Sequence, residues 1–313
     1  MFAFILKRLL ATIPVMLIVA VFVFLMLRLT PNDPAAIIAG DTASAEQVAQ
    51  IRASLGLDKP ILQQFVIWFT RLLQGDLGES FFFKKTVASL IADRIEPTLS
   101  LSILTILLAI SVAVPLGVLA AYKHGTWVDR IVMGFSVMGF SVPAFVIGYV
   151  LIYIFSIQLN WLPVQGYQRI GEGVGGWLYR LVLPSLTLAV IYVALIARMT
   201  RTSMLEVLGE DYIRTARAKG QSERVVLFRH ALRNAAVPIV TVIGIGVALL
   251  IGGVVVTESV FTIPGLGRLT VDAVLARDFP TIQAVILLFS FVYVMVNLLV
   301  DVAYTFLDPR IRY

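Results

Sequence analysis

Long stretches without a charged residue are the feature that most constrains how this chain can fold. Between Arg8 and Arg28 lie nineteen uncharged, mostly apolar residues. As a helix that rises about 1.5 Å per residue, this stretch nearly matches a hydrocarbon core of about 30 Å. A cleaved signal peptide is the competing interpretation, but the apolar core of a signal peptide is usually only about 7 to 15 residues long. The stretch therefore predicts a first transmembrane helix.

Five further uncharged stretches predict an all-α integral membrane protein with about six transmembrane helices. Only 14% of the residues are charged, whereas a soluble domain has about 25%. The net charge of +6 does not indicate a nucleic-acid partner, because the basic residues flank apolar stretches and do not gather on one polar face. The five further predicted helices cover residues 98–122, 131–157, 181–197, 235–257 and 279–300.

Basic residues are distributed unevenly between the two sides of these helices. The four segments on the side of the chain termini hold fourteen basic residues, and the two short loops on the opposite side hold four. Short loops rich in Lys and Arg face the cytoplasm. The sequence therefore predicts a multi-pass protein with cytoplasmic N- and C-termini.

The helix pattern divides the chain into three regions. Residues 1–29 form the cytoplasmic N-terminus and the first transmembrane helix, and residues 30–97 form a small extracytoplasmic helical subdomain. Residues 98–313 form a five-helix core that includes a cytoplasmic loop, residues 198–236.

The subdomain contains start signals for three short helices. Ser44 is expected to cap the first, Pro60 suits the first turn of the second, and Thr86 is expected to cap the third. Apolar residues in the second recur at helical spacing and give it one apolar face. This face either lies on the membrane surface or packs on the transmembrane helices.

The cytoplasmic loop 198–236 carries eight basic and four acidic residues. Thr202 or Ser203 is expected to start a helix, with Gly220 in the left-handed conformation just beyond its end. Ser222 is expected to cap a second helix. From the residues alone, this helix pair is either a plain hydrophilic connection or a surface for a partner protein. DNA binding is disfavoured, because both ends are tethered to membrane spans.

Enzymatic chemistry finds little support in the sequence. The chain lacks the G-x-x-x-x-G-K-[ST] sequence that cradles nucleotide phosphates, so energy must come from another chain or from a gradient. A serine intramembrane protease would need a base beside Ser141, but His124 and His230 fall in cytoplasmic loops. A zinc protease would need H-E-x-x-H, which is absent, and the chain has no cysteine for a thiolate metal site.

Few polar residues mark the predicted spans. An aspartyl protease would need two buried carboxylates, and only Asp301 lies clearly near a span. A secondary transporter or channel is the rival class, although such proteins usually show several ionisable groups at mid-membrane or two similar halves. The candidates for a pathway or structural role are Ser141, Pro143, Asn297 and Asp301.

Residues 209–220 and 230–235 closely resemble the coupling loop of ABC-importer permeases of the dipeptide/oligopeptide (peptide/nickel) family. The resemblance covers nearly the whole chain and is closest to the first membrane subunit of dipeptide permeases. Asn32 stands where the family typically shows Gly, and Arg214-Thr215-Ala216 replaces the Glu-Ala-Ala of the broader ABC permease pattern. Other segments that carry the resemblance are 31–34, 55–60, 75–78, 264–268, 297–301 and 308–310.

The resemblance implies a type I ABC importer-like permease of a bacterial inner membrane. Such a subunit forms half of the translocation pathway for di- or oligopeptides, with nickel complexes or glutathione as alternatives. The implied partners are a second homologous permease, two cytoplasmic ABC ATPase subunits that hold ATP and Mg, and an extracytoplasmic substrate-binding protein. This chain itself would bind no cofactor. The residues expected at the ATPase contact are Glu210, Asp211, Tyr212, Arg214, Thr215, Ala216, Arg217, Lys219, Gly220 and Glu223.

Overall fold

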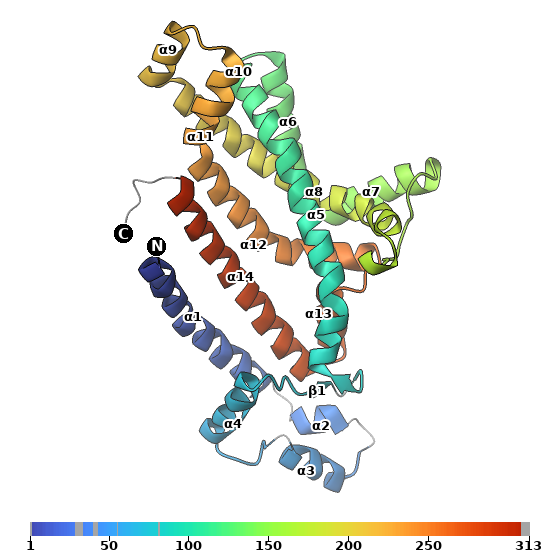
Figure 1. The fold of residues 1–313 in the computed structure, drawn as a ribbon. Coiled ribbons are helices and arrows are strands. Elements are labelled where there is room, and N and C mark those ends of the chain that lie inside the picture. Colours follow the sequence, from blue (N-terminus) through green and yellow to red (C-terminus); the bar gives the residue numbers. More distant parts are fainter. Residues whose placement is uncertain (1, 29–33, 40–42, 55, 81, 308–313) are drawn as a thin grey trace. The chain divides into compact units, whose positions relative to one another are not determined.

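The protein is a set of long helices, described here by a computed structural model. Five helices within the described residues are long and apolar enough to cross a membrane, and a bent pair of helices brings the number to six (Figure 1). The prediction of an all-α membrane protein is therefore confirmed. The resembling segments at 31–33 and 308–310, and the basic residues Arg310 and Arg312, lie outside the described residues. The structure describes residues 2–28, 34–39, 43–54, 56–80 and 82–307.

The chain divides into two compact units, of which the first comprises Met1–Ile95 and Arg268–Met295. In this unit α1 packs against α4 and the first part of α14, with Ala20, Val23 and Leu287 buried between them. Its elements are α1 (Phe2–Arg28), α2 (Pro34–Ala39), α3 (Ala45–Ser54), α4 (Ile61–Leu73), the antiparallel strands β1 (Glu79–Ser80) and β2 (Lys85–Thr86), and parts of α5 (Val87–Tyr122), α13 (Leu266–Leu275) and α14 (Phe279–Leu307).

The predicted helices of the outer segment are partly confirmed. Ser44 and Gln47 cap α3 reciprocally, each backbone N–H donating to the other's side chain. Pro60 occupies the N-cap position of α4. The aromatic face of α4 packs on α1, where Phe24 lies 5.1 Å from Phe65, ring centre to ring centre.

Thr86 caps the third predicted helix, since its hydroxyl accepts a hydrogen bond from the backbone N–H of Ser89. The prediction that this helix is short is wrong, because it does not stop before the membrane. It continues through Pro97 for 36 residues and becomes the second span. No glycine lies between Val87 and Leu116, and a membrane helix tolerates Pro when neighbours satisfy the freed carbonyl. The boundary between residues 97 and 98 thus falls inside α5.

The second unit comprises Glu96–Gly267 and Val296–Tyr313. The long helix α8 is its centre, with α5, α6, α7 and α12 packed around it. Besides the remaining parts of α5, α13 and α14, its elements are α6 (Trp127–Ser141), α7 (Ala144–Leu151), the π-helix η1 (Ile152–Gln158), the 3₁₀-helix η2 (Ile170–Glu172), α8 (Val174–Leu208), α9 (Asp211–Ala218), α10 (Glu223–Val225), the π-helix η3 (Val226–Ala231), α11 (Leu232–Asn234) and α12 (Ala236–Val260).

The third predicted span is not one straight helix. α6 and the combined helix Ala144–Gln158 meet at an angle of 106°. The break falls at Val142 and Pro143, because proline restricts the residue before it to extended conformations and Val142 has φ −99° and ψ 125°. The prediction of a single continuous span over residues 131–157 is therefore wrong.

Glycines bring two of the helices very close to α8. A Cβ atom on Gly117 of α5 would lie 2.5 Å from the Cβ of Thr200, and one on Gly139 of α6 would lie 2.9 Å from the Cβ of Ala194. Contacts this short do not occur between real side chains, so these positions require glycine. Close packing through small residues is the usual way in which membrane helices associate.

We expect Gly139→Val to force α6 away from α8 and to destabilise the protein by about 1–3 kcal/mol, the usual cost of overpacking. Gly134→Val is the matched control on the same helix, because no described atom lies within 4 Å of its Cβ position. Thermal unfolding of both variants in detergent checks this. Equal melting temperatures for the two would contradict the inferred packing.

Candidate functional site

The loop of residues 198–236 forms a folded cap at one end of the second unit, and we call it the cap. α8 continues without interruption to Leu208, so the prediction that Thr202 or Ser203 starts a new helix is wrong. The hydroxyl of Thr202 donates to the carbonyl of Arg198, as expected for a threonine inside a helix. The break comes at Gly209, and α9 follows.

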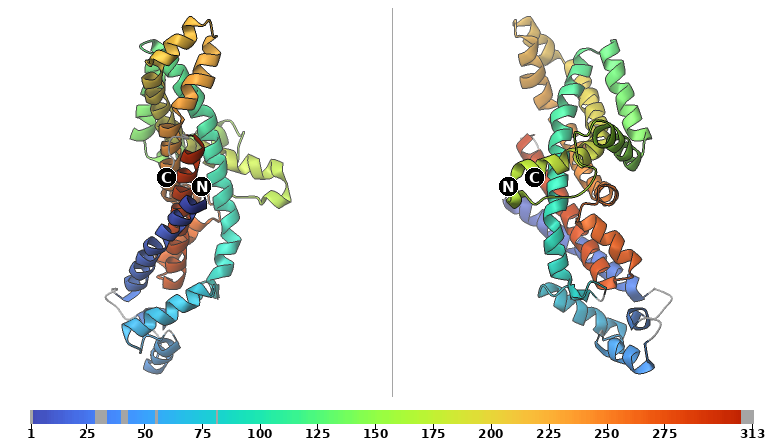
Figure 2. Two further views of the ribbon diagram at one scale, coloured as in Figure 1. Left: turned by 60° about the vertical axis from the view of Figure 1, so that its left-hand side comes forward. Right: turned by 90° about the vertical axis from the view of Figure 1, so that its right-hand side faces the viewer.

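One face of the cap is apolar and packs on the transmembrane helices. Ile213 of α9 and Val226 of η3 are completely buried. They share a core with Val118 of α5, Met204 of α8 and Ile239 of α12. The cap therefore contacts three membrane helices at once, as Figure 2 shows for α9 and α10 beside the ends of α5 and α8.

The opposite face of α9 is charged and exposed. Tyr212 is 43% exposed, and the side chains of Asp211 and Arg214 form an ion pair that is almost fully in solvent. Burial, and then the charge of Glu210, raise the pKa of the Tyr212 hydroxyl, which therefore stays protonated. Among the residues expected at a partner contact, Ala216 alone lies on the buried face, and the others are exposed or half-buried.

Gly220 forms the turn between the two helices of the cap. Its φ of +75° confirms the predicted left-handed conformation, which disfavours any residue with a Cβ atom. An ion pair of 2.9 Å between Arg217 and Glu223 braces the two sides of this turn. Ser222 occupies the N-cap position of α10, but without a side-chain hydrogen bond.

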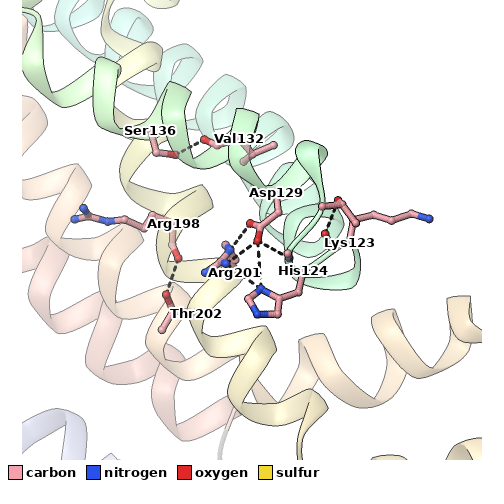
Figure 3. A network of polar contacts seen from close by, with 10 residues as sticks. Lys123, His124, Asp129, Val132, Ser136, Arg198, Arg201 and Thr202 are labelled. Carbon is pink, nitrogen blue, oxygen red and sulfur yellow. Dashed lines mark hydrogen bonds and ion pairs between the residues drawn. The ribbon is translucent and has the colours of Figure 1, made fainter.

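A second polar cluster, which the sequence analysis missed, joins α6 to α8. Asp129, in the first turn of α6, is 4% exposed. Both of its carboxylate oxygens accept hydrogen bonds from the guanidinium of Arg201, and Oδ2 also accepts from the backbone N–H of Gly125 (Figure 3). Nδ1 of His124 lies 3.2 Å from the same oxygen. We call these four residues the Asp129 clasp.

The clasp contains a bidentate Arg–carboxylate ion pair that is mostly buried. Such pairs fix geometry more strictly than single contacts. The sequence does show one signal for the clasp, an acid at the start of an apolar stretch. No neighbouring residue, however, indicates that the partner of Asp129 is Arg201, 72 residues further along the chain. The clasp therefore ties the short loop before α6 to the helix that leads into the cap.

The candidates for a pathway or structural role lie apart from the cap. Ser141 ends α6 and its hydroxyl donates to the carbonyl of Val137, while Pro143 lies in the bend as the N-cap residue of α7. Asn297 and Asp301 lie on α14. No described contact joins Ser141 to a histidine.

The expectation that only Asp301 lies near a span is wrong. Glu258, near the end of α12, is completely buried and accepts a hydrogen bond of 2.6 Å from Thr98. Gly265 and Gly267 close over it, since a Cβ on Gly265 would lie 2.1 Å from its carboxylate oxygen. Glu258 lies one residue beyond the predicted end of this span at Thr257, where it was not expected to be buried. Because protein atoms enclose the carboxylate, it has no access to a substrate.

Membrane-length helices around one central helix, with a folded basic cap between two of them, define a multi-pass membrane protein. The sequence matches the family described as "Binding-protein-dependent transport system inner membrane component" over residues 113–313, and the N-terminal family of the same systems over residues 1–102. The chain therefore belongs to the binding-protein-dependent transport family of ABC-importer permeases.

Relatives match over essentially their full length. A probable peptide ABC transporter permease of Sinorhizobium fredii is 58% identical over 310 residues, 99% of either chain. A putative peptide transport permease of Brucella abortus is 48% identical, and the glutathione transport permease GsiC of Salmonella choleraesuis is 47% identical, each over all 313 residues and 100% of both chains.

A solved structure shares the fold. A chain of the MetNI methionine ABC transporter in an inward-facing conformation matches with a TM-score of 0.57 and 18% identity, covering 71% of this chain and 97% of that one. The predicted type I importer-like fold is thereby confirmed. The chain is thus a membrane subunit of a binding-protein-dependent importer.

We expect the Asp129 clasp to stabilise the folded protein far more than the exposed ion pair of Asp211 and Arg214 on α9 does. Either Asp129→Ala or Arg201→Ala leaves an unpaired, poorly solvated charge and should cost about 3–5 kcal/mol of stability. In a double-mutant cycle the two should couple by about 1–3 kcal/mol. Asp211→Ala with Arg214→Ala, the same residue types at an exposed site, should couple by at most about 0.5 kcal/mol. Chemical unfolding of the detergent-purified variants measures both cycles, and equal coupling would contradict the assignment.

Proposed function

We propose that this chain forms half of the pathway of an ATP-driven importer of di- and oligopeptides, and that the cap over residues 198–236 is its contact with an ATPase subunit. A second, homologous permease forms the other half. Two cytoplasmic ABC ATPases bind ATP and Mg and carry out hydrolysis, and an extracytoplasmic binding protein delivers the substrate.

The two faces of α9 are the observation that carries this proposal. A segment that only connects two helices needs no buried core. In α9, however, Ile213 is completely buried and the side chains on the opposite face are charged. Tyr and Arg are enriched at protein interfaces, and Tyr212, Arg214 and Arg217 are all exposed on α9. The residues proposed for this contact are Glu210, Asp211, Tyr212, Arg214, Thr215, Arg217, Lys219, Gly220 and Glu223, with Ala216 supporting them from the buried face.

The packing beneath the cap suggests how motion reaches the membrane. A push on α9 acts through Ile213 on a core that includes α5, α8 and α12. The Asp129 clasp adds α6, because Arg201 of α8 is bound to the first turn of α6. Four helices would therefore respond together when the partner ATPases close. An allosteric mechanism requires that these contacts differ between two states of the transporter.

The family description supports a bacterial inner-membrane location, and the charge distribution supports cytoplasmic termini. The cap is the most basic segment between two spans, and basic segments of this length remain on the cytoplasmic side. This orientation also places the cap where ATP and its hydrolysing subunits are found.

Peptides are the proposed substrate because relatives named as peptide permeases match this chain over its full length. Glutathione is the second candidate, since the relative named as a glutathione permease is nearly as similar as the Brucella protein. Glutathione is itself a tripeptide, so both substrates belong to one chemical class.

The complete transporter, reconstituted in vesicles with its binding protein, tests this function. We expect di- or oligopeptides to stimulate ATP hydrolysis and to accumulate in the lumen only when ATP is supplied on the side of the cap. Glutathione in place of the peptide distinguishes the second candidate. Uptake driven by an ion gradient without ATP would overturn the proposal.

We further expect Gly220→Val to uncouple ATP hydrolysis from transport. A β-branched residue is strained at φ +75°, so the turn and the relative placement of α9 and η3 must change. Peptide uptake per ATP hydrolysed should fall at least about tenfold, equivalent to about 1.4 kcal/mol of lost coupling, while the protein still inserts.

Gly75→Val is the matched control, because Gly75 has φ +80° and no described atom within 4 Å of its Cβ position, as at Gly220, but lies outside the cap. Both variants should be present in membranes in similar amounts, and only Gly220→Val should lose coupling. Normal abundance of Gly220→Val with parental uptake per ATP would show that the cap does not transmit the motion.

A further inference from the structure

An apolar groove lies on the second unit, between α5, α6 and α8. Its volume is about 380 Å³, within the range of about 300–1,000 Å³ found for small-molecule sites. Ala189 and Val193 of α8 form a buried floor, and Val112 and Phe135, each 44% exposed, form the rim. The groove is therefore open at its side and not an enclosed packing defect.

The lining offers no hydrogen bond to a ligand. Ser136 is the only residue with a polar side chain among those that line the groove, and its hydroxyl is buried and already donates to the carbonyl of Val132. A peptide would leave its own backbone groups unsatisfied against such a surface. The groove thus selects a hydrocarbon occupant and is unsuited to the transported substrate.

The length of the groove matches one leaflet of a bilayer. Its lining runs from Leu108 to Leu116 on α5 and from Leu186 to Ala197 on α8. At about 1.5 Å per residue these segments are about 12 and 16 Å long. Half of a hydrocarbon core of about 30 Å is about 15 Å, so a single acyl chain spans the groove.

Residues typical of a membrane interface lie at the end of the groove nearest the cap. Tyr122 ends α5 and Trp127, 71% exposed, begins α6. Aromatic residues in such positions mark the level of the lipid headgroups. Lys123 and Arg130 are exposed at the same two helix ends. The one acid between them, Asp129, is already neutralised by Arg201.

We propose that this groove binds one acyl chain of an anionic phospholipid in the leaflet on the side of the cap, with its phosphate held by Lys123 and Arg130. The apolar lining selects the chain, and the uncompensated positive charge at the helix ends selects the anionic headgroup. Ala197 of the groove lies one helical turn before Arg201 of the clasp on α8, so under the proposed function the lipid would support the helices that carry motion from the cap.

Photolabelling of the complete transporter in nanodiscs tests this site. The probes are phosphatidylglycerol and phosphatidylcholine that carry the same photoactivatable acyl chain. We expect phosphatidylglycerol to label residues 108–116, 131–136 and 186–197 preferentially. Lys123→Ser with Arg130→Ser should reduce this labelling at least about fivefold, since each basic residue near a membrane surface contributes about fivefold to the attraction of anionic lipid. Lys85→Ser, at an exposed lysine outside the second unit, should change nothing.

A second pair of variants tests the groove itself. Val112→Trp fills the space from the rim and should remove most of the labelling, whereas Leu107→Trp, at a position that is 60% exposed on the same helix but does not line the groove, should not. Equal labelling of the groove by both lipids in the unaltered transporter would overturn the proposal. Crosslinks from the groove residues to the second permease in place of lipid would do so as well.

Discussion

The whole structure depends on the absence of water in the hydrocarbon core, because every backbone N–H and C=O there must find its partner within the protein. Continuous helices meet this requirement by themselves, and the sharp bend between α6 and α7 meets it too. At the bend the N–H of Val142 still donates to the carbonyl of Met138, and Pro143 has no N–H to satisfy. After η1, Trp161 donates to the carbonyl of Phe155 at 2.8 Å. The irregular backbone is thus hydrogen-bonded where it leaves the helix.

The same requirement explains why α8 can serve as the axis of the second unit. Its 35 residues correspond to about 52 Å, longer than a hydrocarbon core of about 30 Å. The excess extends beyond the membrane and becomes part of the core of the cap, through Met204. Because no break separates the membrane part from this extension, a displacement of the cap moves one rigid element.

The sequence was sufficient for features that depend on local chemistry. Apolar length alone indicated the spans, and Ser44, Pro60 and Gly220 each lie at the helix end where their local chemistry predicted them. The turn of the cap was predicted from Gly220, which suits the left-handed conformation just beyond a helix end. Predictions were wrong where one residue type suits two positions. The hydroxyl of Thr202, for example, can cap the start of a helix or donate to a carbonyl inside a helix.

Features that join distant parts of the chain could not be predicted from one sequence. Asp129 and Arg201 are 72 residues apart, and Thr98 and Glu258 are 160 apart. Either acid, seen by itself, is an unexplained charge beside an apolar stretch. Only the fold shows that both are buried and already satisfied. The 106° bend at Val142 belongs to the same class, because Pro143 is also compatible with a mild kink, and the packing of α7 against α8 and α12 decides the angle.

The clasp also determines what charge the end of the second unit presents to the membrane. If Asp129 were exposed, its carboxylate would offset one of the two basic residues beside it and repel an anionic headgroup. Bound to Arg201 and nearly buried, it is neutralised from within the protein. Lys123 and Arg130 then remain as uncompensated charges at the ends of α5 and α6. A single ion pair thus holds α6 to α8 and, at the same time, leaves the adjoining surface positive, so that helix packing and lipid recognition depend on the same carboxylate.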